Sequence, residues 1–104
     1  MRVDLLYFPG CPHVDAARTQ LRRALAQAGL PTEWNELDVK APATPPELRG
    51  YGSPSILIDG VDVLGAPPGD ALACRFYAGS DLPGAPPLEA LLRALNQAAA
   101  EPSR

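Results

Sequence analysis

Short apolar runs bounded by turn residues predict four β-strands. The runs are Val3–Phe8, Thr32–Val39, Ser55–Ile58 and Val61–Leu64. The first ends at Pro9-Gly10, and we expect it to be buried on both faces because it is mostly apolar. Asp59-Gly60 separates the last two runs by two residues, which is a strong hairpin signal. The pattern therefore predicts an antiparallel pair of strands after two separate earlier strands.

Two segments repeat apolar residues every three or four positions and predict amphipathic helices. The first apolar face comprises Val14, Ala17, Leu21, Ala24, Leu25 and Ala28, and the last comprises Leu88, Leu91, Leu92, Leu95 and Ala98. Pro12 suits the first position of the first helix, and Gly29 suits a left-handed cap at its end. Pro87 opens the last helix, whereas Pro45–Arg49 predicts one or two helical turns at most.

The predicted order is strand, helix, strand, weak helix, two strands, helix. A helix between the first two strands suits a crossover that leaves them parallel. The class is therefore α/β, in a single domain over residues 1–100 with a flexible tail at 101–104. The segment Ala71–Tyr77, which contains Cys74, fits either a strand or a short helix.

Composition restricts the partners and the cellular location that we expect for this domain. The chain has 104 residues, of which 46% are hydrophobic, and its net charge of −3 gives no reason to expect nucleic acid or an anionic membrane as a partner. The pattern contains neither a signal-peptide core nor an apolar run that could span a membrane, so we expect a cytoplasmic protein with reduced thiols. Its abundant proline and alanine are typical of a GC-rich bacterial genome. We expect a monomer or a weak homodimer.

Cys11 is the residue with the clearest candidate chemistry. It follows an apolar strand and Pro9-Gly10, and it precedes a helix that we expect to open on Pro12. A cysteine that caps a helix faces unpaired N–H groups and the positive end of the helix dipole, and both favour the thiolate. His13 would add to this effect if protonated. The alternatives are a small buried side chain for Cys11 and a solvated first-turn residue for His13.

Two local features together resemble the thioredoxin fold. Cys11-Pro12-His13 lies where the first strand meets the first helix, and Ser53-Pro54 directly precedes the third strand. The resemblance implies a β-α-β-α-β-β-α order, with a central four-stranded mixed sheet flanked by helices. It also implies a cis Pro54 against Cys11, with the Ser53 backbone free to pair with an extended substrate. Phe8, Pro9, Ser53 and Pro54 are the substrate-binding residues expected on this basis.

The motif departs from the dithiol members of that family. The position of their second cysteine is Val14, so a dithiol reaction at this motif is impossible. The nearest analogy is to monothiol glutaredoxins, which use one cysteine and glutathione. Cys74 is a candidate resolving thiol if it comes close to Cys11, and a buried structural residue otherwise. The expected catalytic set is therefore Cys11, Pro12, His13 and Cys74.

These patterns predict a monothiol thiol–disulfide oxidoreductase with Cys11 as the nucleophile. Its partner would be a protein or small-molecule disulfide or thiol, with glutathione as co-substrate and neither metal nor organic cofactor. One alternative is a non-enzymatic adaptor that recruits a partner strand at Ser53-Pro54, and another is soft-metal binding by the thiols. We expect Asp4, Glu36 and Asp38 to lie at strand edges, and Arg75 to be either a surface residue or an anion ligand.

Overall fold

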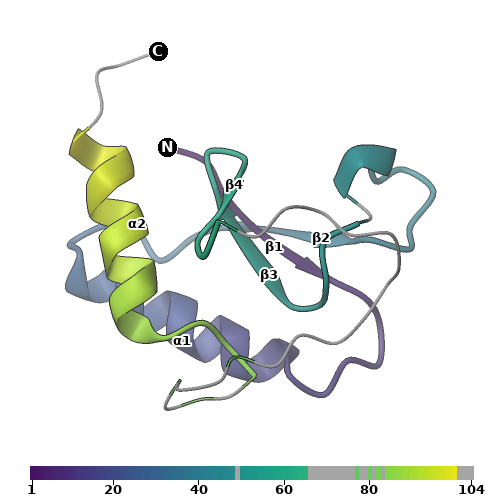
Figure 1. The fold of residues 1–104 in the computed structure, drawn as a ribbon, viewed down its shortest axis with the longest axis horizontal. Helices are drawn as coiled ribbons and strands as arrows, with labels where there is room; N and C mark the ends of the chain where they lie inside the picture. Colours follow the sequence, from purple (N-terminus) through teal and green to yellow (C-terminus); the bar gives the residue numbers. More distant parts are fainter. Residues whose placement is uncertain (49, 66–76, 78–79, 81, 83, 101–104) are drawn as a thin grey trace.

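The chain forms a four-stranded mixed β-sheet with two α-helices (Figure 1). In order, the elements are β1 (Val3–Tyr7), α1 (Val14–Gln27), β2 (Asn35–Asp38), the 3₁₀ turn η1 (Pro46–Leu48), β3 (Ser55–Ile58), β4 (Val61–Asp62) and α2 (Leu88–Ala100). The computed structural model describes residues 1–48, 50–65, 77, 80, 82 and 84–100. Within them the predicted α/β class and the order of elements are confirmed.

The strand order in the sheet is β2-β1-β3-β4. β1 runs parallel to β2 and antiparallel to β3, and β3 pairs antiparallel with β4. Residues Val3 to Leu6 of β1 are buried, which confirms the prediction of a strand covered on both faces. The end of β1, where the cysteine follows, therefore lies at the centre of the sheet.

The start of α1 differs from the prediction. The helix begins at Val14 with His13 as its N-cap, so Cys11 is not the cap and Pro12 is not the first helical residue. The cause is the turn before it. The Cys11 amide donates to the carbonyl of Phe8 at 3.3 Å, and Gly10 has a φ of +88°. With proline second and a positive-φ glycine third, this is a β-turn that ends at Cys11.

The end of α1 is as predicted. Gly29 has a φ of +72°, and its amide donates to the carbonyl of Ala26 at 3.1 Å. The amide of Leu30 donates to the carbonyl of Leu25 at 2.9 Å. These two bonds form a Schellman motif, which satisfies carbonyl groups that the helix end would otherwise leave unpaired.

Strand β2 is shorter than predicted because its partner is short. The parallel register pairs Asp4 with Asn35, so Thr32 and Glu33 would lie opposite the first two residues of the chain, before β1 begins. At the other end, the amide of Val39 still donates to the carbonyl of Tyr7 at 2.8 Å, although Val39 lies outside the strand.

The β3–β4 hairpin has the predicted two-residue turn. Asp59 and Gly60 have φ values of +51° and +84°, which is the combination that a two-residue hairpin turn of this kind needs. β4 is shorter than the predicted Val61–Leu64, because the Asp62 carboxylate accepts the amide of Leu64 at 3.0 Å and turns the chain away from the ladder.

Both α-helices cover the same face of the sheet. On that face a cluster of buried residues joins β1 and β3 to α1 and α2, and it comprises Val3, Leu5, Cys11, Val14, Ala17, Leu21, Ala24, Leu25, Ile56, Ile58, Ala85, Leu91 and Leu95. On the other face Leu6, Leu57 and Val39 are covered by side chains that include Leu48 of η1. The helices in Figure 1 accordingly lie together on one side of the strands.

Asp4 is buried and does not lie at a sheet edge as predicted. Its strand is central, so the residue is surrounded by protein and only 3% of its surface is exposed. The guanidinium of Arg2 lies 2.8 Å from one oxygen, and the amide nitrogen of Asn35 donates to the other at 3.0 Å. Glu36 and Asp38 are on the edge strand β2, as predicted.

Some predictions concern residues outside the described part of the chain. These are Cys74, Arg75, most of the segment Ala71–Tyr77 and the tail at 101–104. The domain limits stay a prediction. None of the helices in the described ranges is long and apolar enough to cross a membrane.

Candidate functional site

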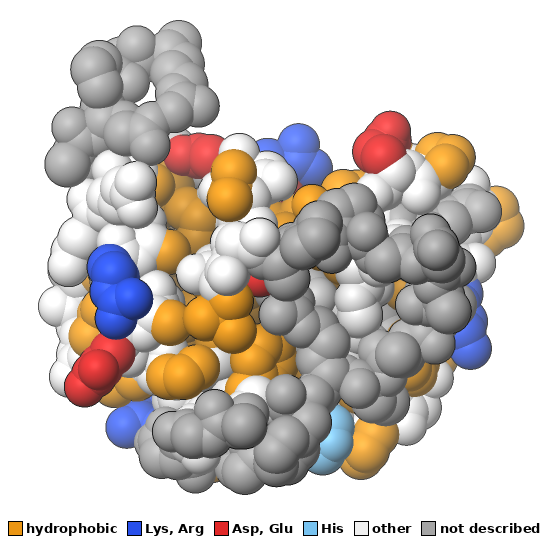
Figure 2. All heavy atoms as spheres, in the orientation of Figure 1, with side chains coloured by type: hydrophobic (Ala, Val, Ile, Leu, Met, Phe, Trp, Pro, Cys, Tyr) orange, Lys and Arg blue, Asp and Glu red, His pale blue; other side chains and the backbone are white. Residues whose placement is uncertain are grey.

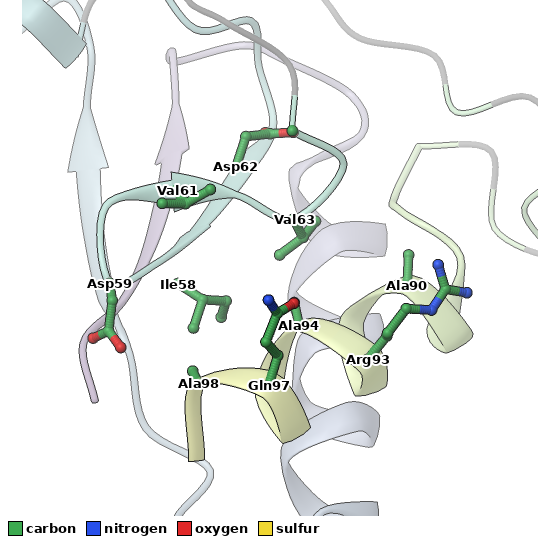
Figure 3. Close-up of a pocket in the computed structure, with 11 residues that line it drawn as sticks. Ile58, Asp59, Val61, Asp62, Val63, Ala90, Arg93, Ala94, Gln97 and Ala98 are labelled. Atoms are coloured by element: carbon green, nitrogen blue, oxygen red, sulfur yellow. The ribbon is translucent and has the colours of Figure 1, made fainter. Parts of the chain in front are cut away.

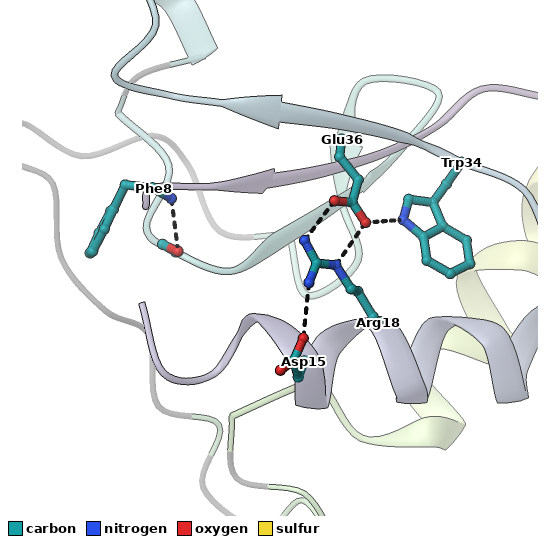
Figure 4. A network of polar contacts seen from close by, with 6 residues as sticks. Phe8, Asp15, Arg18, Trp34 and Glu36 are labelled. Atoms are coloured by element: carbon teal, nitrogen blue, oxygen red, sulfur yellow. Dashed lines mark hydrogen bonds and ion pairs between the residues drawn. The ribbon is translucent and has the colours of Figure 1, made fainter. Parts of the chain in front are cut away.

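The β-turn after β1 holds Cys11 against a second segment of the chain. The sulfur of Cys11 donates to the carbonyl oxygen of Ser53, 3.6 Å away and 42 residues later. The backbone amide of Phe8 donates to the hydroxyl of Ser53 at 3.2 Å, drawn as the dashed line from Phe8 in Figure 4. The peptide bond between Ser53 and Pro54 is cis. The structure thus brings together the two segments that the sequence marked as candidates.

Ser53 and Pro54 lie behind the thiol. Ser53 is 0% exposed, and Pro54 is among the fully buried side chains. The hydroxyl of Tyr77 donates to the carbonyl of Pro54 at 2.6 Å, which fixes this segment from the far side. The expectation that the Ser53 backbone is free for an extended substrate is therefore wrong, because the residue is buried and its carbonyl accepts the Cys11 thiol.

An open pocket of about 230 Å³ lies beside Cys11. Its lining includes Phe8, Pro9, Gly10, Cys11, Asp15 and Arg18. Phe8 and Pro9, two of the residues predicted to bind substrate, thus lie in the lining of this pocket beside Cys11. Cys11 itself is only 9% exposed, and it is one of the residues that line this open pocket.

His13 and Pro12 do not line this pocket. His13 is half-buried, and its side chain lies against Gly84, in the segment before α2. A Cβ on Gly84 would be 2.6 Å from the Cβ of His13, which is too close for two carbon atoms. The structure therefore assigns His13 a packing contact, while Pro12 is exposed to solvent.

A charged network forms one wall of the pocket. Arg18 donates two hydrogen bonds to Glu36 at 2.9 and 2.8 Å and a third to Asp15 at 2.9 Å (Figure 4). The indole N–H of Trp34 donates to Glu36 at 3.0 Å. The hydrogen bonds to Glu36 raise the pKa of Arg18, and those from Arg18 lower the pKa of Glu36, so both stay charged at neutral pH.

Sequence reasoning missed this network. The spacing of Asp15 and Arg18, three residues apart on one helix, is a local signal for an ion pair. Nothing local indicates Glu36, which lies 18 residues beyond Arg18 and is brought to it by the parallel pairing of β1 and β2.

A second pocket of about 320 Å³ lies between the β3–β4 hairpin and α2 (Figure 3). Its apolar lining includes Ile58, Val61, Val63, Ala94 and Ala98. Figure 2 shows hydrophobic side chains gathered on this face of the molecule. The described residues of this lining include neither a cysteine nor a histidine.

Among the described residues, no group of three or more histidine, cysteine or acidic side chains is placed to hold a metal ion. Cys74 is outside those residues, so the alternative of metal binding by both thiols stays a prediction. Comparison of the chain with protein-family models, curated proteins and solved structures finds no match. The function is therefore argued from the site.

Proposed function

We propose that the chain is a thioredoxin-like protein in which Cys11 performs thiol–disulfide exchange with a single motif thiol. One observation carries the proposal. The Cys11 sulfur lies at the end of the central strand, 3.6 Å from the carbonyl before the cis Pro54, and lines an open pocket.

The sheet supports the thioredoxin-like interpretation. A four-stranded mixed sheet, with the first two strands parallel and the hairpin antiparallel, agrees with what the resemblance implies. The two helices on one face are also compatible with it. The 3₁₀ turn η1 takes the place of the weak helix on the opposite face.

The reaction begins when the Cys11 sulfur, as a thiolate, attacks one sulfur of a disulfide. A bond forms between Cys11 and that sulfur, and the disulfide bond of the substrate breaks. The departing thiolate takes up a proton. Cys11 is thereby oxidised to a mixed disulfide, and the departing half of the substrate is reduced.

The second step needs another thiol. Val14 occupies the position of a second motif cysteine, and its buried side chain has no thiol. An external thiol such as glutathione, or Cys74, would attack the mixed disulfide, release the bound half and return Cys11 to the thiol. In this proposal the protein works in the cytoplasm on a protein or small-molecule disulfide, with no metal or organic cofactor.

Intact-mass spectrometry with 2-hydroxyethyl disulfide, which is small and neutral, tests the proposal. In a Cys74→Ser background only Cys11 can react, and the further change Cys11→Ser gives the blank. We expect the folded protein to form a mixed disulfide at Cys11 faster than the same chain unfolded in urea, and added glutathione to reverse it. A folded protein that reacts more slowly than the unfolded chain would contradict the proposal.

The low exposure of Cys11 favours a second candidate, a non-enzymatic binding module. A cysteine that is 9% exposed and packed in the core cluster suits a structural role. Cys11→Ser separates the two functions, because partner binding would survive the change and disulfide exchange would not. The partner surface would differ from the predicted Ser53-Pro54 edge, since both residues are buried.

A further inference from the structure

The pocket beside Cys11 is lined on one side by charged side chains. Two of its lining residues, Asp15 and Arg18, are charged at neutral pH. The guanidinium of Arg18 is already matched by two carboxylates, with paired hydrogen bonds to Glu36 and one to Asp15. The network of Arg18, Asp15 and Glu36 therefore has one positive and two negative groups, of which Arg18 and Asp15 are among the described residues that line the pocket.

Asp15 presents the negative charge to solvent. Its side chain is 93% exposed, and one carboxylate oxygen accepts from Arg18. Figure 4 shows the other oxygen turned away from Arg18. The ammonium of Lys40 lies 5.1 Å from the centroid of the Phe8 ring, and Lys40 is not among the described residues that line the pocket. Among the described lining residues, Asp15 therefore presents a carboxylate oxygen to a ligand in the pocket, whereas Arg18 is already matched by two carboxylates.

The size of the pocket restricts the ligand. At about 230 Å³ it is smaller than the roughly 300–1,000 Å³ typical of sites for drug-sized ligands. A small disulfide with a short charged arm suits this volume. The arm would extend from the sulfur at Cys11 toward the first turn of α1, where Asp15 lies.

We propose that Asp15 makes the Cys11 pocket selective for small disulfides that carry a positively charged group close to the reacting sulfur. This inference rests on the proposed exchange reaction and adds its substrate class. Cystamine, the disulfide of an aminothiol, represents the favoured chemistry. In the reaction the Cys11–sulfur bond forms, the cystamine disulfide breaks, and the aminothiol departs as the reduced product.

Three disulfides in the Cys74→Ser background test the selectivity. They are cystamine, which is cationic, 2-hydroxyethyl disulfide, which is neutral, and dithiodiglycolate, which is anionic. Asp15→Asn removes the carboxylate from the pocket lining, and Glu89→Gln removes an exposed charge from the first turn of α2 as the matched control. Rates of mixed-disulfide formation are compared between proteins for each disulfide, so that intrinsic reactivity cancels.

We expect Asp15→Asn to slow the reaction with cystamine by about two- to fivefold at low salt, the range of an exposed ion pair. The rate with the neutral disulfide gives the effect of the change on Cys11 itself, and relative to it the anionic disulfide should react faster and cystamine more slowly, with added salt removing the differences. Glu89→Gln should change none of the rates. Equal effects of Asp15→Asn on all three disulfides, or no effect on any, would overturn the inference alone. No reaction of Cys11 with the neutral disulfide in any protein would overturn the proposed function, and the inference with it.

Discussion

Gly84 lies so close to His13 that its missing side chain is what allows the contact. A Cβ at Gly84 would be 2.6 Å from the Cβ and 2.7 Å from the Nδ1 of His13. We therefore expect Gly84→Ala to push His13 aside and to lower the free energy of unfolding by about 1–3 kcal/mol, the usual cost of overpacking. Urea unfolding followed by circular dichroism measures the change.

A double-mutant cycle tests whether this loss of stability arises from the contact between Gly84 and His13. His13→Gly removes the Cβ and the ring that the new methyl group would meet, so Gly84→Ala should cost much less in that background. The N-cap position tolerates the glycine, because His13 makes no side-chain cap bond that would be lost. An equal cost in both backgrounds would mean that Gly84 is required for another reason.

Gln20 ties α1 to the segment that carries Gly84. Its side chain is 0% exposed, and its amide nitrogen donates to the carbonyl of Pro86 at 3.1 Å. Gln20→Leu keeps the approximate size and leaves that buried carbonyl without this donor. We expect a loss of about 1–3 kcal/mol in the free energy of unfolding, measured by urea unfolding.

The matched control for Gln20 is on the same helix. Gln27→Leu makes the same chemical change at an exposed position in the last turn, where substitutions usually alter stability by less than ~0.5 kcal/mol. A similar effect of the two changes would show that the bond to Pro86 contributes little.

Much of the fold could be predicted because its boundaries are local. Pro9-Gly10, Gly29 and Asp59-Gly60 end elements through their own backbone preferences, and the structure shows the expected positive φ at Gly29 and also a positive φ at Gly10 and Gly60. The predicted boundaries were wrong where a hydrogen bond or a strand pairing with other residues sets the end of an element. The hydrogen bond from the Cys11 amide to Phe8 delays the start of α1, and the register with β1 shortens β2.

The candidate site was predictable in part. Cys11 and Pro54 were singled out by their positions around the strands, and the structure brings their segments together. The burial of Ser53, the contact of His13 with Gly84 and the bond of Arg18 to Glu36 join residues that are distant in sequence. Such contacts depend on how the elements pack, and no periodicity or spacing within one segment encodes them.

A second cysteine at Val14 tests whether the motif has thioredoxin-like geometry. In a Cys74→Ser background, we expect Val14→Cys to form an intramolecular disulfide with Cys11 in an oxidising glutathione buffer, because the position matches the second cysteine of dithiol motifs. Intact mass would show the loss of two hydrogens. Val14 is 8% exposed and packs in the core, so the reduced variant should be less stable by about 1 kcal/mol.

Asp15→Cys is the control for this disulfide. It adds a cysteine one residue later on the same helix, where the side chain is 93% exposed and faces a different direction. We expect this variant to accumulate glutathione adducts in place of an internal disulfide. Adducts on both variants, with no internal disulfide in either, would contradict the proposed geometry.

Glu36 makes the stability of the protein depend on pH in the acid range. Hydrogen bonds from Arg18 hold the pKa of Glu36 below its ordinary value of 4.5, so the folded state favours the ionised carboxylate. The stabilisation is complete above pH 4.5 and disappears as the pH falls through the lower pKa of the folded state. Because both side chains are about a third exposed, we expect it to contribute about 0.5–1 kcal/mol.

Urea unfolding of Glu36→Gln across the acid range measures this contribution. The variant should be less stable than the wild type at pH 7, and the difference should shrink toward zero between pH 4.5 and the lower pKa of Glu36 in the folded protein. Glu33→Gln, at an exposed position three residues earlier, should match the wild type throughout. If the difference in stability between the wild type and Glu36→Gln stayed constant with pH, the charge of Glu36 would not contribute to stability. Its hydrogen bonds to Arg18 and Trp34 would then stabilise the fold through shape and polarity alone.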